Sequence, residues 1–337
     1  MIAAGGKDLS SHYVRIYQKS IQGSDFASAR SLLFAWINDF FAALPVPPAR
    51  QHLRDSRLWH CLANYASLSA DRSLVELFWS RVEAVVPTLG APVAAWPVLG
   101  IPVVNRPDLL ERLLLSLDAP VQTLALVDNG SGGAHPDAAA LASLLQNLQV
   151  DPPTGVAQVR VARPFGNLGV AASWNQVLTG FPQAPFTLLV NNDVVFAPGV
   201  LQEALACLNP ARAQFLPLLP PPQEFSAFAL TALAWDRVGL FDESFYPAYC
   251  EDLDYADRLR QCPEVEWLHC PDLQKRMQAL NPDHSATIRS DAVLEGYNRF
   301  SYPLNCLWYF SERRHRGERR GVWRRRWLAE WATDSPA

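Results

Sequence analysis

A group of carboxylates in the second half of the chain is the strongest candidate for chemistry. The run G-L-F-D-E-S-F at Gly239–Phe245 is followed by E-D-L-D-Y at Glu251–Tyr255, with aromatic residues between the two acidic runs. A carboxylate partly desolvated by aromatic rings suits a general base that takes a proton from a hydroxyl, and Asp252, with Glu251 beside it, is the candidate. The same acids would also stabilise the N-terminus of a helix over 252–261.

A second candidate is the run Asn191-Asn192-Asp193, which ends the most apolar expected strand. Asp193 could hold Mg²⁺ or Mn²⁺ through oxygen, with the remaining ligands supplied by phosphates and water. Such a cation neutralises the charge that grows on a departing diphosphate. N-N-D is equally a good turn sequence, so this run alone leaves both interpretations open.

Two further polar segments suit a nucleotide. Asp128-Asn129-Gly130-Ser131 offers a carboxylate to a base or ribose, and its small residues let the backbone approach a ligand. Asn167-Leu168-Gly169 precedes an expected helix, whose first amides favour a nearby anion. Each segment is also an ordinary turn or cap sequence.

The elements that must position these residues alternate between short apolar runs and helical stretches over about 96–300. This alternation predicts an α/β fold with a mostly parallel sheet and crossover helices. Strands are expected at 98–104, 123–127, 158–162, 186–191, 214–219 and 225–231, and helices at 107–117, 136–148, 170–178 and 198–208. Ligands bind beyond the carboxyl ends of such strands, which is where the polar segments lie.

Three zones are expected along the chain. Residues 1–92 form a helical N-terminal region, with Ser24 and Asp25 as an N-cap and a proline-rich linker at its end. Residues 93–300 form the α/β domain. Residues 301–337 form a basic, tryptophan-rich helical tail in which eight arginines and one glutamate fall within 313–326.

The composition supports a soluble globular protein. Of 337 residues, 49% are hydrophobic and 18% charged, so a large core is available, and the net charge of −4 argues against a nucleic-acid partner. The six cysteines are scattered without a C-x-x-C pair, which favours reduced thiols. No leader and no apolar run of membrane-spanning length is apparent, so a cytoplasmic location is expected.

Taken together and in order, these segments resemble glycosyltransferase family 2, inverting transferases with the GT-A fold. The resemblance covers about residues 98–300. It rests on N-R-P at Asn105, V-D-N-G-S at Val127, N-L-G-x-A at Asn167 with Asn175 behind it, N-N-D at Asn191, and G-L-F-D-E-S-F leading to E-D-L-D-Y-x-x-R.

The resemblance implies a role for each matched position. Asp252 would be the general base, with Glu251 alongside, for in-line attack on the anomeric carbon with inversion. Asp193 would bind the metal, and His284, in a late His-x-x-(Ser/Thr) segment, can join it, although a surface-loop histidine is an equal alternative. The donor nucleotide would be bound by the remaining positions: Asn105, Arg106, Asp128, Asn129, Asn167, Gly169, Asn175, Asn191 and Asn192.

Some positions depart from the family pattern. Val103 and Val104 precede Asn105 where relatives often have threonine and an aromatic residue, and Asn191 replaces the first acid of the D-x-D motif, which would weaken metal affinity. No Q-x-x-R-W motif follows the acids, so a processive synthase is not expected. The resemblance favours a non-processive, rhamnosyltransferase-like member that adds one sugar in the assembly of bacterial surface polysaccharide.

The remaining inferences concern partners and alternatives. The tail interleaves arginines with Trp323, Trp327 and Trp331, which suits either an anionic membrane surface at the inner face or packing on the catalytic domain. The acceptor, whether a saccharide, glycolipid or protein, is not indicated. A non-catalytic sugar-nucleotide-binding module stays open because of Asn191. A nucleotidyltransferase or nicotinamide oxidoreductase is disfavoured because no G-x-G-x-x-G run follows the first strand.

Overall fold

The computed structural model describes residues 3–45, 53, 55–85, 94–130, 132, 135–282, 286–289 and 292–313. The chain divides into two compact units, Met1–Thr88 and Leu89–Ala337. No helix within the described ranges has the length and apolar character needed to cross a membrane.

The first unit consists of helices. Aspartates begin three of them. Asp25 Oδ1 accepts the Ser28 amide at 3.0 Å, as expected, Asp55 Oδ1 accepts the Leu58 amide at 3.1 Å, and Asp71 Oδ1 accepts the Ser73 amide at 2.9 Å. The helical N-terminal region predicted from the sequence is therefore confirmed. Its helices are α1 (Ala3–Gln22), α2 (Phe26–Ala42), α3 (Ser56–Ser69) and α4 (Ser73–Val85). They share a core of their own that includes Leu33, Trp36, Ile37, Leu58, Leu62 and Phe78.

The second unit is built on a seven-stranded sheet with the strand order β3-β2-β1-β4-β6-β5-β7. The strands are β1 (Trp96–Val103), β2 (Val121–Asp128), β3 (Val156–Ala162), β4 (Phe186–Val190), β5 (Gln214–Pro217), β6 (Ala227–Thr231) and β7 (Glu266–Trp267). Strands β1 to β4 run parallel, as the sequence predicts, and the α/β fold class is confirmed. β6 is antiparallel to both β4 and β5, because only a loop, and no crossover helix, connects β5 to β6.

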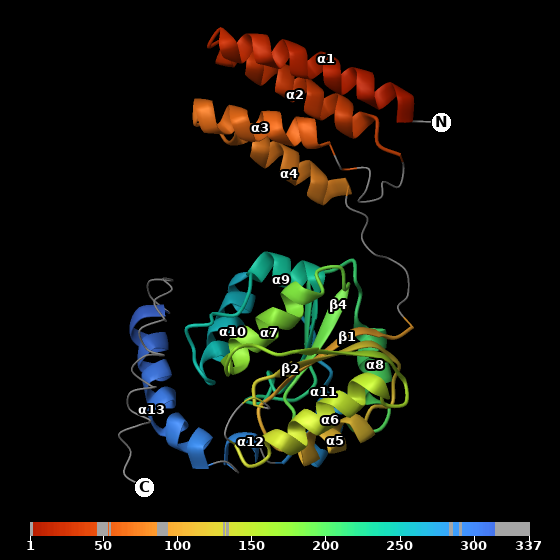
Figure 1. Cartoon of the computed structure of the whole chain (residues 1–337), viewed down its shortest axis with the longest axis vertical. Coiled ribbons are helices and arrows are strands. Elements are labelled where there is room, and N and C mark those ends of the chain that lie inside the picture. Colours follow the sequence, from red (N-terminus) through yellow and green to blue (C-terminus); the bar gives the residue numbers. More distant parts are fainter. Residues whose placement is uncertain are drawn as a thin grey trace. The chain divides into compact units, whose positions relative to one another are not determined.

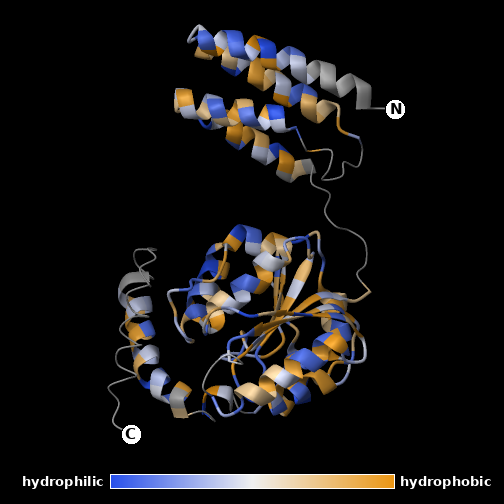
Figure 2. Ribbon diagram, in the orientation of Figure 1, coloured by the Kyte–Doolittle hydropathy of each residue, from blue (hydrophilic) through white to orange (hydrophobic). Residues whose placement is uncertain are grey.

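Helices cover both faces of this sheet (Figure 1). Residues alternate along each strand, so Leu99 and Ile101 face one layer while Val98 faces the other. The first layer holds α5 (Pro107–Leu115), α6 (Ala138–Val150), α8 (Val200–Cys207) and α11 (Pro271–Leu280). The second holds α7 (Gly169–Gly180), α9 (Ala232–Val238) and α10 (Glu251–Gln261). Figure 2 shows the apolar residues concentrated along the strands between the two layers.

The end of the described chain is helical and packs on the sheet domain. It comprises α12 (Ala286–Arg289), α13 (Ala292–Trp308) and a short π-helix, Tyr309–Arg313. The boundary expected between residues 300 and 301 falls inside α13, so the first part of the expected tail belongs to the same helix as residues before it. The arginine and tryptophan positions from 314 onward lie outside the described residues.

Candidate active site

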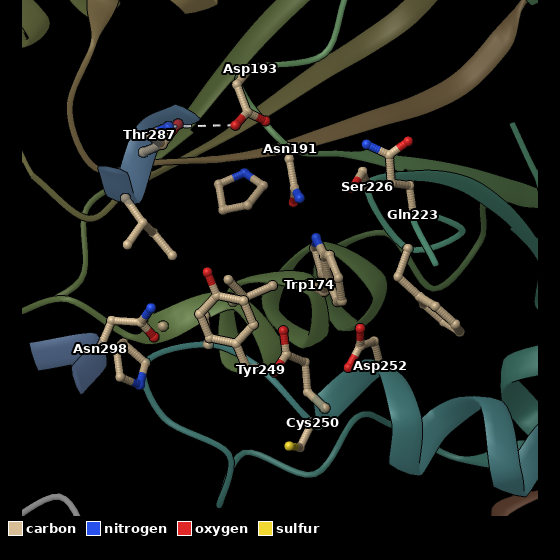
Figure 3. A pocket seen from close by; sticks show the side chains of 18 of the residues that line it. Trp174, Asn191, Asp193, Gln223, Ser226, Tyr249, Cys250, Asp252, Thr287 and Asn298 are labelled. Carbon is tan, nitrogen blue, oxygen red and sulfur yellow. Dashed lines mark hydrogen bonds between the residues drawn. The ribbon is translucent and has the colours of Figure 1, made fainter. Parts of the chain in front are cut away.

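A cavity of about 630 Å³ lies at the carboxyl ends of the central strands (Figure 3). Its lining combines the ends of β1 and β4, the first turns of α7 and α10, and side chains from α12 and α13. Asp193, which follows β4, and Asp252, at the start of α10, lie on facing walls of this one cavity. The topology thus brings together carboxylates 59 positions apart. Asp193 follows a strand, as the strand-end pattern predicts, whereas Asp252 comes from the start of a helix.

The two acids at the start of α10 differ in environment. Glu251 is 5% exposed, and its Oε2 has no hydrogen-bond partner among the described residues. Burial, with a smaller contribution from the negative charge of Asp252, raises the pKa of Glu251 well above its usual value. Burial also raises the pKa of Asp252, while backbone amides at the helix start, including that of Leu253 at 2.8 Å, oppose this shift. The pair therefore favours a neutral Glu251 beside an Asp252 that ionises more readily.

The turn that delivers these acids has an unusual backbone. Tyr249 and Cys250 have φ angles of 76° and 72°, a left-handed conformation that is uncommon outside glycine. Asn305 on α13 stabilises this turn, since its Nδ2 donates to the carbonyls of Ala248 at 2.9 Å and Tyr249 at 3.2 Å. Backbone strain of this kind clusters at functional sites, where the surrounding structure maintains it.

The neighbourhood of Asp193 is held by the short helix α12. The backbone amide of Thr287 lies 3.5 Å from Asp193 Oδ2. The hydroxyl of Thr287 donates to Asn192 Oδ1 at 2.8 Å. The side-chain amide of Asn192 donates through Nδ2 to the backbone oxygen of Asn105 at 3.2 Å. Asn105 and Asn192 are buried, whereas Asp193 is partly exposed. These two asparagines join α12 to the ends of β1 and β4.

The side chains of Asn129 and Asn167 shape the cavity by holding the backbone before the start of α7. Asn129 Oδ1 accepts the Leu168 amide at 2.9 Å, and Asn167 Oδ1 accepts the Gly169 amide at 2.8 Å. Gly169 has a φ of +76°, and a Cβ there would lie 2.6 Å from the backbone oxygen of Pro247. Asn129, Asn167 and Gly169 all line the cavity, and Gly169 allows the turn before the acids to pack against the start of α7.

Other expected nucleotide-binding residues are not in the cavity lining. Asp128 is buried beside the cavity-lining Asn129 and pairs with Arg163 at 3.5 Å. Arg106 forms an ion pair with Asp108 at 2.7 Å. Asn175 bonds to both backbone groups of Phe241, with its Nδ2 donating at 2.9 Å and its Oδ1 accepting at 2.8 Å, so it joins α7 to the G-L-F-D-E-S-F run.

Of the two predicted metal ligands, the structure describes only one. Asp193 lines the cavity, whereas His284 lies outside the described residues. Within the described ranges, no three histidine, cysteine or acidic side chains gather as a metal-binding group. A cation at Asp193 would therefore take ligands from a diphosphate and water in addition to this carboxylate, and oxygen ligands suit Mg²⁺ or Mn²⁺.

Several cavity residues were not predicted from the sequence. Gln223 and Ser226 come from the β5–β6 loop, Trp174 from α7, and Asn298 and Tyr302 from α13. The indole nitrogen of Trp174 is buried without a partner among the described residues. The prolines at 220–222 indicated a loop, but the order of strands in the sheet decided that this loop reaches the cavity.

Comparison with known proteins gives limited similarity. No model of a known protein family matches the chain. A galactofuranosyl glycosyltransferase of Leishmania donovani is 25% identical over 231 residues, which cover 48% of this chain and 52% of the relative. The chain thus spans about half the length of this relative.

Solved structures with similarity include S. aureus TarS 1–349, with a TM-score of 0.40 and 15% identity over 65% of this chain and 73% of that chain. The same TarS fragment in complex with UDP-GlcNAc has a TM-score of 0.40 and 14% identity over 51% of this chain and 55% of that chain. GalNAc-T7 with UDP, GalNAc and Mn²⁺ has a TM-score of 0.40 and 10% identity over 63% of this chain and 52% of that chain.

Proposed function

We propose that this chain is an inverting, non-processive glycosyltransferase that moves one sugar from a nucleoside diphosphate carrier to an acceptor hydroxyl. The observation that carries the proposal is the single cavity lined by both Asp193 and the Glu251–Asp252 pair. The motif order that resembles family 2 and the similarity to a galactofuranosyl glycosyltransferase support it.

The chemistry follows from the positions of the acids. Asp252 takes the proton of the acceptor hydroxyl as its oxygen forms a bond to the anomeric carbon, and the bond from that carbon to the diphosphate oxygen breaks. Attack opposite the departing diphosphate inverts the anomeric configuration. The raised pKa of Glu251 favours its neutral form beside the base. A divalent cation, when bound, would neutralise charge on the diphosphate, and Asp193 would supply one of its oxygen ligands.

A thermal-shift screen of nucleoside diphosphate sugars, with and without Mn²⁺, tests the binding step. We expect one sugar nucleotide to raise the Tm by several degrees, because a ligand at 100 times its Kd stabilises by about 2.7 kcal/mol. We expect Asp252→Asn to lower transfer or donor hydrolysis about 100- to 10,000-fold and Asp193→Ala to abolish the effect of Mn²⁺. Asp272→Asn, on the exposed start of α11, is the matched control.

Two results would contradict the proposal. Full activity in both Asp193→Ala and Asp252→Asn would show that the assigned residues do not perform the reaction. Binding of a sugar nucleotide with no turnover would instead favour the non-catalytic binding module, which the asparagine at position 191 suggests.

A further inference from the structure

Gln223 is a buried polar side chain that the protein itself does not use. It is 6% exposed, lines the cavity, and its side-chain amide has no hydrogen-bond partner among the described residues. Its amide atoms are not among the fully enclosed polar atoms of the described residues that lack a partner, so a molecule in the cavity can reach them. An amide in this situation at the wall of a cavity indicates a partner that enters from the cavity.

The loop that carries Gln223 holds it in one place. The amide of Gln223 donates to the oxygen of Pro220 at 2.8 Å, and the amide of Ser226 donates to the oxygen of Gln223 at 2.9 Å. The oxygen of Ser226 accepts the amide of Asn191 at 2.8 Å, which ties the loop to the end of β4. Gln223 is therefore fixed relative to Asp193, two residues after Asn191.

The groups beside Gln223 share its chemistry. The side chains of Asn191 and Ser226 also line the cavity and form no hydrogen bond with the described residues (Figure 3). Two amides and a hydroxyl are neutral and can both donate and accept, which matches the hydroxyl groups of a sugar ring. Glu224, in the same loop, and Arg260 add one charge of each sign to the lining.

We propose that Gln223, with Asn191 and Ser226, binds the hydroxyl groups of the sugar on the donor, and that Gln223 helps to set which sugar is accepted. This inference rests on the proposed function, since a sugar attached to a diphosphate near Asp193 and attacked near Asp252 has to lie between those two walls. The loop that joins β5 to β6 is thus a sugar-specificity loop.

Calorimetry on the full chain with Mn²⁺ tests this assignment by comparing each sugar nucleotide with its free nucleoside diphosphate. The probes are UDP, UDP-galactose, UDP-glucose, UDP-N-acetylglucosamine, GDP, GDP-mannose, dTDP and dTDP-rhamnose. For the donor that wild type binds, we expect Gln223→Leu to weaken sugar-nucleotide binding about 3- to 10-fold, the value of one neutral hydrogen bond. Binding of the free diphosphate should stay within 2-fold.

Control variants separate recognition from folding. Gln223→Leu removes no hydrogen bond within the described protein, so its Tm should equal or exceed that of wild type. Gln278→Leu, on an exposed position of α11, should change neither affinity. Gln223→Glu keeps the shape and the acceptor oxygen and should fall between wild type and Gln223→Leu.

Each failure has its own meaning. If wild type binds none of the nucleotides, the proposed function and this inference both fail. If Gln223→Leu weakens free diphosphate and sugar nucleotide equally, or changes neither affinity, the proposed function stands and the sugar assignment is wrong.

Discussion

At the scale of single residues, burial distinguishes two adjacent acids of similar chemistry. Glu251 has an unpartnered, buried oxygen, whereas Asp252 accepts an amide at the first turn of α10. Both pKa values are raised, and Asp252 receives more of the compensating hydrogen bonds. The order of the two acids in the sequence therefore matters: both line the cavity, but the first residue of the helix is buried and the second is partly exposed.

A test at this scale is Glu251→Gln. In the folded protein Glu251 holds its proton above the pH at which the unfolded chain releases it, so folding becomes less favourable as pH rises from about 4.5. The glutamine variant lacks this penalty. We expect it to raise the Tm at pH 7 by about 2–4 °C, the equivalent of about 1 kcal/mol.

Calorimetric scans from pH 4 to pH 8 measure this effect. The difference between Glu251→Gln and wild type should shrink towards pH 4, where the side chain is protonated in both states. Glu111→Gln, on an exposed position of α5, is the control. A variant that is less stable than wild type at pH 7 would show that Glu251 is ionised and paired in the folded protein.

At the scale of elements, α13 supports the turn before Glu251 and Asp252. Asn305 donates to backbone oxygens of the turn, and Trp308 and Tyr309 pack with Phe245 and Cys250. Tyr309 also donates its hydroxyl to Asp257 on α10. Residues of α13 and of the π-helix that follows it thus contact both the strained turn and α10, so they help to position Asp252.

Asn305→Ala tests this positioning role. Losing its donor leaves the left-handed turn less well held, and small displacements of a reacting group are costly for catalysis. We expect kcat to fall about 10-fold or more while the KM for the donor stays within about 2-fold. Steady-state kinetics measure both constants, and Asn147→Ala, on an exposed position of α6, is the matched control.

The changes in kcat and in the KM for the donor together decide whether Asn305 has this positioning role. A drop in kcat that is matched by a large rise in donor KM would indicate general damage to the cavity. Unchanged kinetics would show that the turn keeps its conformation without this hydrogen bond.

At the scale of the whole molecule, the chain has two units with separate cores. The core of the first unit includes Leu33, Trp36 and Ile37, all at most 1% exposed. Each predicted site residue that the structure describes belongs to the second unit. The first unit therefore contributes no described residue to the cavity.

Leu33→Ala tests this separation. The substitution opens a cavity in the first unit, and we expect that unit to lose about 2–5 kcal/mol of stability. Differential scanning calorimetry should show a transition that moves to lower temperature and a second that stays. Sugar-nucleotide affinity at 15 °C should be unchanged, whereas an equal shift of both transitions would show that the units unfold together.

How much could be read from the sequence depends on the range of the interactions involved. Apolar periodicity and caps are local, so the strands and helices that position the site lie close to the predicted ranges. The run around Asn191 was expected at the carboxyl edge of the sheet because it follows a strand. The run around Glu251 follows no strand directly, and only the family resemblance placed it near Asp193. The roles assigned to these residues stay predictions.

Tertiary structure decided what local patterns do not encode. The sequence could not indicate that Asn175 faces Phe241, that Gln223 reaches the cavity, or that Asn305 holds the turn before Glu251. Each of these depends on the packing of segments distant in the chain. The environment of Glu251 has the same origin, because burial by surrounding elements, and not residue type, shifts its pKa.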